Sequence, residues 1–140
     1  MATILLGQDD YVGQWVSREV GKLWVSGKAL GFIENGKLLA GVAFTNYDGA
    51  NVWMDCAAVP KSRWLDRRAL WAIFHYPFIQ LKCTRVTAAI PESNDKSIKL
   101  VTSAGFEYEA ALERAAPGGE SMFLYRMFNE KCRWLKRGSE

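Results

Sequence analysis

The spacing of hydrophobic positions divides the chain into strand-like and helix-like segments. In its first half, three mostly apolar runs are separated by Asn35-Gly36 and by Asp48-Gly49. These dipeptides tolerate the positive φ angles of tight hairpin turns, so they predict an antiparallel meander of three strands. The expected strands are residues 30–34, 37–46 and 51–59.

Apolar residues at helical spacing predict three helices. The first is expected over residues 8–21, with its apolar positions on one face and Gly21 as its terminator. The second is expected over residues 61–83, where Pro77 should kink or shorten the last turn. The third is expected over residues 94–104.

Further strand-like runs complete the pattern at residues 2–7, 85–90, 106–115 and 121–128. The predicted order is therefore β-α-β-β-β-α-β-α-β-β. This order favours an α+β fold with α and β elements mixed along the chain: a mixed, mostly antiparallel sheet flanked by helices. A chain of 140 residues is typical of one domain, so we expect a single domain over residues 1–140.

Composition and charge narrow the class of protein. Apolar residues make up 49% of the chain and charged residues 24%, which argues against bulk disorder. The three cysteines lie far apart without a CxxC pair, so no disulfide framework or zinc site is indicated. The first ten residues lack the basic region of a signal peptide, and no apolar run reaches about 18 residues. We expect a cytoplasmic protein.

The stretch "NDKSIKLVTSAGF" carries the most specific pattern in the sequence. Asn94 and Ser97 stand where a strand passes into a helix, and Gly105-Phe106 follows the helix. With Glu109 a little further on, this segment resembles the GNAT superfamily of acetyl-CoA-dependent N-acetyltransferases. "FHYPFIQLKCTRVTA" resembles the ribosomal-protein-acetylating branch, and the C-terminal "EKCRWL" is similar to small GNAT-like proteins of phages and prophages. The resemblance covers residues 30–128 as a core, with a short basic tail at residues 129–140.

The resemblance implies an acetyl-CoA site, with acetyl-CoA as co-substrate. A strand edge that splays from its neighbour offers free N–H and C=O groups to the amide-rich pantetheine arm, and a helix N-terminus attracts the pyrophosphate. Residues at the end of the central strand would bind the pantetheine arm, and Asn94 would bind it from the opposite side. The loop after the strand would bind the phosphates, and Trp64 would cover the adenine or the ribose. The implied cofactor-binding residues are Ala57, Ala58, Val59, Arg63, Trp64, Arg67, Arg68, Asn94 and Ser97.

The sequence departs from the family pattern at two places. The phosphate loop of the family is glycine-rich, but Asp66 and Arg68 stand where its glycines belong. A carboxylate there would repel a pyrophosphate unless it turns outward, whereas Arg67 and Arg68 would attract it. Many relatives also carry a Tyr that protonates the leaving thiolate, and the matching position here is Val101.

Three residues are candidates for the acid and base of the reaction. Ser97 in the first turn of its helix is the nearest replacement for the missing acid, with Tyr125 on the last strand as a second candidate. Asp55 on the central strand is the candidate base for an ammonium acceptor. The alternative for Asp55 is a structural ion pair with a nearby Arg, and the alternative for Ser97 is a structural hydrogen bond.

Two classes of function remain open at this stage. One is an N-acetyltransferase that moves an acetyl group to a primary amine of a protein or a small molecule by direct attack. The other is a non-catalytic GNAT-fold module of binding or phage-structural type, for which the basic, Trp-containing C-terminus suggests contact with nucleic acid. Six Trp residues leave room for an exposed apolar patch and a homodimer.

Overall fold

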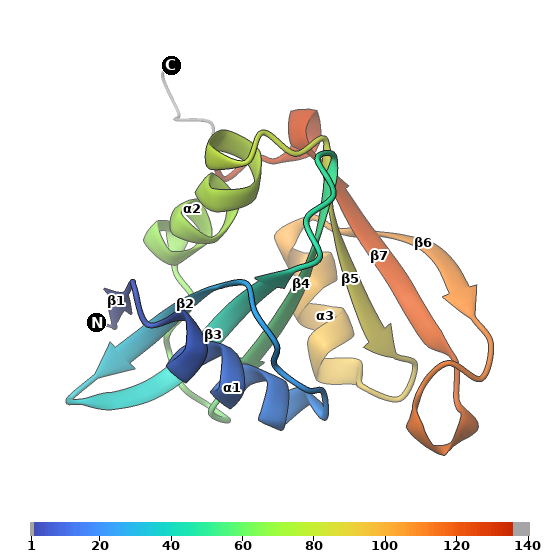
Figure 1. Cartoon of the computed structure of the whole chain (residues 1–140), viewed down its shortest axis with the longest axis horizontal. Helices are drawn as coiled ribbons and strands as arrows, with labels where there is room; N and C mark the ends of the chain where they lie inside the picture. Colours follow the sequence, from blue (N-terminus) through green and yellow to red (C-terminus); the bar gives the residue numbers. More distant parts are fainter. Residues whose placement is uncertain (1, 136–140) are drawn as a thin grey trace.

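A seven-stranded sheet in the order β1-β2-β3-β4-β5-β7-β6 forms the centre of the computed structural model, which describes residues 2–135 (Figure 1). The strands are β1 (Thr3–Leu5), β2 (Lys28–Glu34), β3 (Lys37–Thr45), β4 (Asn51–Ala58), β5 (Arg85–Pro91), β6 (Glu107–Leu112) and β7 (Met122–Phe128). The helices are α1 (Asp9–Val20), α2 (Arg67–His75) and α3 (Asp95–Ala104). The predicted order of elements and the mixed α+β class are both confirmed.

Within residues 2–135 the strands pair antiparallel except for β4 and β5, which are parallel. The predicted meander of β2, β3 and β4 is present, and both of its Asx-Gly turns fall between strands. Asp48 also accepts hydrogen bonds from the N–H groups of Ala50 and Asn51 at 2.9 and 2.8 Å, which fixes the second turn. These backbone bonds hold the pKa of the Asp48 carboxyl below its ordinary value.

Helices cover both faces of the sheet. On one face α1 packs across β2, β3 and β4, with Val12 and Val16 fully buried (Figure 1). Gly41 allows this close approach, because a Cβ built on it would lie 2.6 Å from a methyl carbon of Val16. On the other face, α2 and α3 pack on the alternate side chains of the same strands, such as Val42 and Phe44 of β3.

The second helix begins later than predicted. Asp66 has extended backbone geometry and its carboxylate accepts a hydrogen bond from the N–H of Ala69 at 2.8 Å, which makes it the N-cap of α2. Residues 61–66 therefore form a loop rather than the first turns of a helix. At the other end, the predicted effect of Pro77 is confirmed. The helix passes into a π-helical turn over Tyr76–Gln80, which contains Pro77, and the N–H of Leu81 bonds the carbonyl of Tyr76.

The predicted basic tail is in part a packed segment. Cys132 is buried, and the ring N–H of Trp134 donates to the carbonyl of Ala104 at 2.7 Å. The guanidinium of Arg133 donates to the carbonyl of Ser103 at 2.8 Å. These contacts satisfy carbonyls in the last turn of α3, so residues 129–135 are not a solvated tail. Residues 136–140 of the prediction lie outside the described residues.

Candidate functional site

The centre of the sheet opens where β4 and β5 diverge. Their parallel ladder runs only from the pair Asn51 and Arg85 to the pair Trp53 and Thr87. Beyond it, β4 continues along β3 to Ala58, and β5 continues along β7 to Pro91. Figure 1 shows the two strands separating, with α3 behind the gap. A cleft of about 340 Å³ lies here, lined by residues from both strands, from α3 and from the end of α1.

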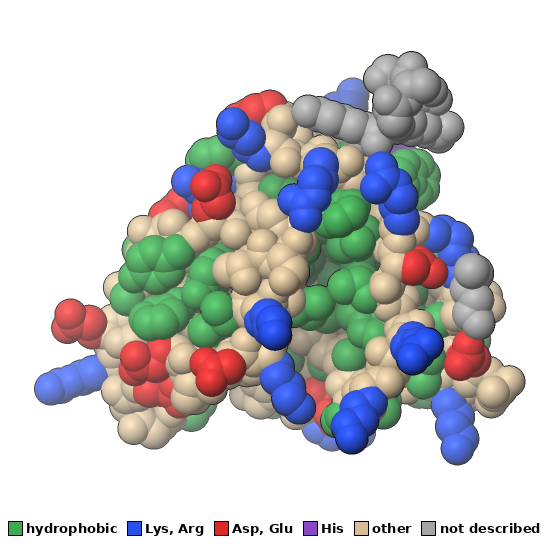
Figure 2. Space-filling view, turned by 180° about the vertical axis from the view of Figure 1, so that it is seen from behind, with side chains coloured by type: hydrophobic (Ala, Val, Ile, Leu, Met, Phe, Trp, Pro, Cys, Tyr) green, Lys and Arg blue, Asp and Glu red, His purple; other side chains and the backbone are tan. Residues whose placement is uncertain are grey.

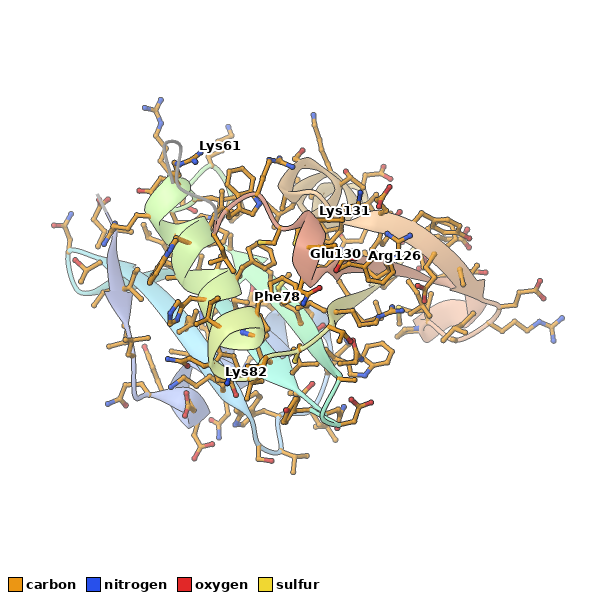
Figure 3. The ribbon with its side chains drawn as sticks, turned by 90° about the horizontal axis from the view of Figure 1, so that it is seen from above. Lys61, Phe78, Lys82, Arg126, Glu130 and Lys131 are labelled. Carbon is orange, nitrogen blue, oxygen red and sulfur yellow. The ribbon has the colours of Figure 1, made fainter. Side chains whose placement is uncertain are left out.

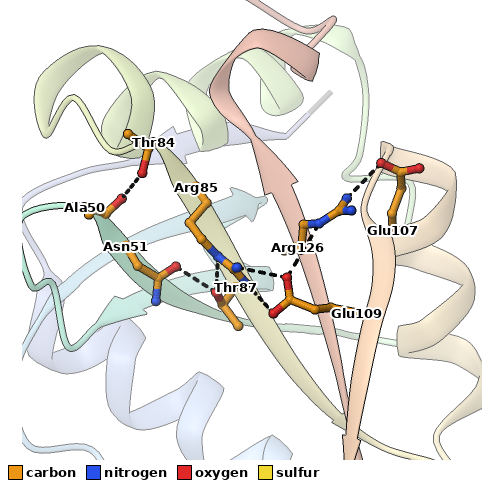
Figure 4. A network of polar contacts seen from close by, with 8 residues as sticks. All are labelled: Ala50, Asn51, Thr84, Arg85, Thr87, Glu107, Glu109 and Arg126. Atoms are coloured by element: carbon orange, nitrogen blue, oxygen red, sulfur yellow. Dashed lines mark hydrogen bonds and ion pairs between the residues drawn. The ribbon is translucent and has the colours of Figure 1, made fainter.

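The closed end of this gap is held by a polar network (Figure 4). The buried Thr87 hydroxyl donates to the side-chain oxygen of Asn51 at 2.7 Å, which ties β5 to β4. Arg85 donates to the Thr87 hydroxyl and also to both carboxylate oxygens of Glu109, at 2.9 and 3.1 Å. The hydrogen bond from Arg85, aided by the charge of Arg126, holds the pKa of Glu109 below its ordinary value. The strands are therefore clamped together at one end and free at the other.

The main chain of β4 presents groups to the open side at alternate residues. The N–H of Val59 donates to the carbonyl of Leu39 at 2.7 Å, so Val59 faces β3. In an antiparallel ladder, alternate residues face the same neighbour, so Ala57 also faces β3. Of the three strand residues expected to hold a ligand, only Ala58 then turns its backbone groups toward the opening. Met54 and Cys56 share the orientation of Ala58. They were missed because the sequence does not show which neighbouring strand the backbone groups of a residue face.

The N-terminus of α3 forms the second wall of the cleft. The side-chain oxygen of Asn94 accepts a hydrogen bond from the N–H of Ser97 at 3.2 Å, so Asn94 is the N-cap of this helix. Both residues line the cleft. Val101 also lines it and is buried, so an apolar surface stands where the resemblance placed a tyrosine.

Asp55 projects from the other face of β4 and is held by Lys22. The ammonium of Lys22 lies 2.7 Å from a carboxylate oxygen of Asp55, and the two side chains are 39% and 16% exposed. Asp55 thus forms an ion pair, but its partner is Lys22 and not the arginine that was expected. Next to it, burial and then the Asp55 charge raise the pKa of Cys56 to about 12, which keeps this thiol neutral. Lys22 was missed because 33 residues separate it from Asp55.

The structure brings together Asp55, Asn94 and Ser97, but it does not bring Tyr125 to them. Tyr125 is buried on β7, where its ring makes an edge contact with Tyr108. It is not among the described residues that line the cleft, although Met122 of the same strand is. Burial, and then the neighbouring Tyr108, raise the pKa of Tyr125, which makes it a weaker acid.

The predicted phosphate loop, Lys61–Arg68, lies at the N-terminal end of α2, and its last two residues are the first two of that helix. Lys61 lies at this end of the helix in Figure 3, and Arg63 and Arg67 are exposed beside it in the sequence. Figure 2 shows the molecule from the side opposite to that of Figure 1, with an apolar hollow near the centre of the view and Lys and Arg side chains around it. A positively charged rim of this kind suits an anionic ligand.

Two residues of this loop region do not have the expected position. Trp64 is buried, with its ring 4.9 Å from that of Phe32, so its face is not exposed to an adenine or a ribose. The guanidinium of Arg68 bonds the carbonyl of Ala2, on the side of α2 that faces β1. Trp64 thus belongs to the hydrophobic core, and Arg68 ties α2 to the N-terminal segment.

Comparisons with solved structures identify the fold. A variant of the spermidine N-acetyltransferase SpeG from Vibrio cholerae superposes with a TM-score of 0.75 at 14% identity, covering 99% of this chain and 98% of that one. The putative acetyltransferase yncA from Salmonella typhimurium, solved with its cofactor acetyl-CoA, gives 0.70 at 17% identity over 91% and 94% of the two chains. A probable acetyltransferase gives 0.65 at 17% identity; 76% of this chain matches it, but only 63% of that longer chain is spanned.

At these identities the likeness establishes the fold. No protein-family model matches the sequence, and no curated protein matches it at a significant level. The chain therefore has the fold of the GNAT acetyltransferases. Any function assigned to it has to be argued from the cleft between β4 and β5. Among the described helices, none is both long enough and apolar enough to cross a membrane.

Proposed function

We propose that this protein is an N-acetyltransferase that transfers the acetyl group of acetyl-CoA to a primary amine by direct attack. The observation that carries the proposal is the cleft between β4 and β5, which reaches both faces of the sheet. Asp55 and Lys22 line it from the α1 face, and Asn94 and Ser97 line it from the α3 face. Donor and acceptor can thus enter from opposite faces and meet at the edge of β4.

The pantetheine arm fits the open edge of β4. Cys56 and Ala58 offer main-chain groups there beyond the last pair of the parallel ladder, and an amide-rich arm can pair with them like an added strand. The oxygen of Asn94 caps α3, which leaves its amide N–H groups as donors toward the arm.

The phosphate end of acetyl-CoA fits less completely. Arg63 and Arg67 are exposed near the N-terminus of α2 and supply positive charge. However, an N–H group in the first turn of α2 is already bonded to an anion, because the Asp66 carboxylate accepts a hydrogen bond from the N–H of Ala69. We infer that side chains rather than a glycine-rich backbone loop carry the phosphate contacts, which makes binding sensitive to salt.

The residues at the meeting point can supply the proton transfers. Asp55 takes a proton from the acceptor ammonium, and the free amine nitrogen attacks the thioester carbonyl carbon. A C–N bond forms as the C–S bond breaks, the Ser97 hydroxyl donates a proton to the departing thiolate, and the surplus proton of the acylated nitrogen restores the hydroxyl. Tyr125 has no place in this scheme, since it lies away from the cleft.

Two measurements test the proposal. Calorimetry with acetyl-CoA measures donor binding, and release of the free thiol in the presence of a panel of primary amines measures transfer. Spermidine belongs in that panel because the name of one structural neighbour includes it. Asp55→Asn and Ser97→Ala should each lower the transfer rate by about 100-fold or more. Glu113→Gln and Ser103→Ala, both exposed outside the cleft, are matched controls that should keep the wild-type rate.

A non-catalytic GNAT-fold module is the second candidate, and the capping of α2 by Asp66 is the observation that favours it. That candidate requires no thiol release with any amine. Its nucleic-acid version relied on Arg133 and Trp134, which are occupied with carbonyls of α3. Fluorescence anisotropy with labelled DNA and RNA tests what remains of it.

The finer expectations remain predictions. They are the ribosomal-protein-acetylating or phage-related branch of the family, a cytoplasmic location, a homodimer and a protein or small-molecule acceptor. Size-exclusion chromatography with light scattering tests the homodimer, and the amine panel tests the acceptor.

A further inference from the structure

The amine of Lys22 lies in the proposed acceptor site of its own chain. Lys22 lines the cleft of about 340 Å³ that contains Asp55 and Ser97, and it also lines an adjoining hollow of about 520 Å³ on the α1 face. Its ammonium is 2.7 Å from the Asp55 carboxylate, which is the proposed base. A primary alkyl amine is thus already paired with the group that would deprotonate an acceptor.

The position of this amine is set by the end of α1. Gly21 adopts a left-handed conformation and closes the helix, with its N–H bonded to the carbonyl of Arg18. The N–H of Lys22 then bonds the carbonyl of Ser17 at 2.8 Å. Its backbone is therefore fixed by the C-terminal cap, and the side chain extends from this fixed point to Asp55. Such tethering raises the effective concentration of an amine at the reacting carbon.

We propose that Lys22 is a site of self-acetylation: bound acetyl-CoA transfers its acetyl group to the Nζ atom of Lys22 within the same chain. The inference rests on the proposed acetyltransferase function. Asp55 removes one proton from the Lys22 ammonium, and the amine attacks the thioester carbonyl carbon. The C–S bond breaks as the C–N bond forms, the thiolate of CoA takes one proton, and a second proton passes to solvent.

The product would change the site. Acetyl-lysine carries no charge, so the ion pair with Asp55 is lost and the acylated side chain fills part of the acceptor side of the cleft. Self-acetylation therefore competes with transfer to an external amine. Lys22→Arg keeps a cation beside Asp55 but cannot be acetylated in this way, which makes it the matched variant.

The test is peptide mass spectrometry of the full chain after incubation with acetyl-CoA. Lys37, the exposed first residue of β3, serves as the internal reference for uncatalysed acetylation. We expect Lys22 to be acetylated about tenfold faster than Lys37 or more, with a half-time that does not change when the protein is diluted. Asp55→Asn should bring Lys22 down to the rate of Lys37. If that variant does not fold, the ratio in the wild-type chain decides.

Two results would overturn the inference: equal rates at Lys22 and Lys37, or a Lys22 rate that falls in proportion to protein concentration. The same samples separate this failure from that of the proposed function. If the wild-type chain releases thiol with an external amine while its own Lys22 stays unmodified, only the self-acetylation is wrong. If no amine causes thiol release and acetyl-CoA does not bind, the acetyltransferase proposal falls with it.

Discussion

Replacing Asp66 by Asn should strengthen the binding of acetyl-CoA. The Asp66 carboxylate caps α2 by accepting from the N–H of Ala69 at 2.8 Å, at the helix end where the pyrophosphate is expected. Asparagine is as good an N-cap as aspartate, so this variant removes the charge and keeps the hydrogen bond. The helix should therefore start at the same residue, and the change in affinity should come from charge alone.

The magnitude follows from the distance. A carboxylate about 6 Å from one phosphate charge repels it by about 1 kcal/mol at an effective dielectric constant of about 50. Removing that repulsion corresponds to about fivefold in the dissociation constant. The gain should shrink at high ionic strength, because the site is at the surface and salt screens exposed charges.

Calorimetry of the wild type and Asp66→Asn at low and high salt measures this gain. Acetyl-pantetheine, which lacks the phosphates, is the matched ligand and should bind both proteins equally. Asp66→Ala separates the cap from the charge, since it should cost about 1 kcal/mol of folding stability. An Asn variant that binds acetyl-CoA no better than the wild type, with its fold intact, would refute the placement of the pyrophosphate at α2.

Three further predictions concern the frame of the cleft. Gly41→Ala should destabilise the protein by about 1–3 kcal/mol in urea unfolding, because the new methyl would meet Val16 at 2.6 Å; an unchanged midpoint would contradict the close packing of α1. Thr87→Val should cost about 1–3 kcal/mol by removing the buried hydroxyl that donates to the half-buried Asn51, measured by the same unfolding, with Thr102→Val on the exposed side of α3 as control. Glu109→Gln should lower stability at neutral pH but not in acid. The hydrogen bond from Arg85 depresses the pKa of Glu109, so its stabilisation exists above the ordinary carboxyl pKa and is lost as pH falls; an equal deficit at all pH values would exclude this charge effect.

Local chemistry in the sequence determined much of the fold. Asn35-Gly36 placed the first turn, because both residues adopt positive φ. Asp48-Gly49 placed the second, where Gly49 has positive φ and the Asp48 side chain accepts from the two N–H groups that follow. Asn94 marked the start of α3 in the same way, since its side chain caps the helix three residues on. These signals act over a few residues and need no knowledge of the rest of the chain.

The start of α2 depends on signals that compete within one segment, namely apolar periodicity, a capping side chain and the burial of an aromatic ring. The apolar spacing over residues 61–83 was helical throughout, yet α2 begins only at Arg67. The side chain of Asp66 was available as a cap, and the burial of Trp64 against Phe32 draws the preceding loop toward the sheet. That burial depends on a strand about thirty residues earlier in the chain, so periodicity alone could not place the boundary.

The site depended on tertiary structure to a greater degree. The sequence identified Asp55, Asn94 and Ser97 as candidates, but their common cleft exists only because β4 and β5 diverge after three paired residues. It gave no sign that Lys22 meets Asp55, since 33 residues separate them and no periodicity links them. Turns and caps are fixed by neighbours along the chain, whereas the opening of the sheet and the pairing across it are fixed by neighbours in space.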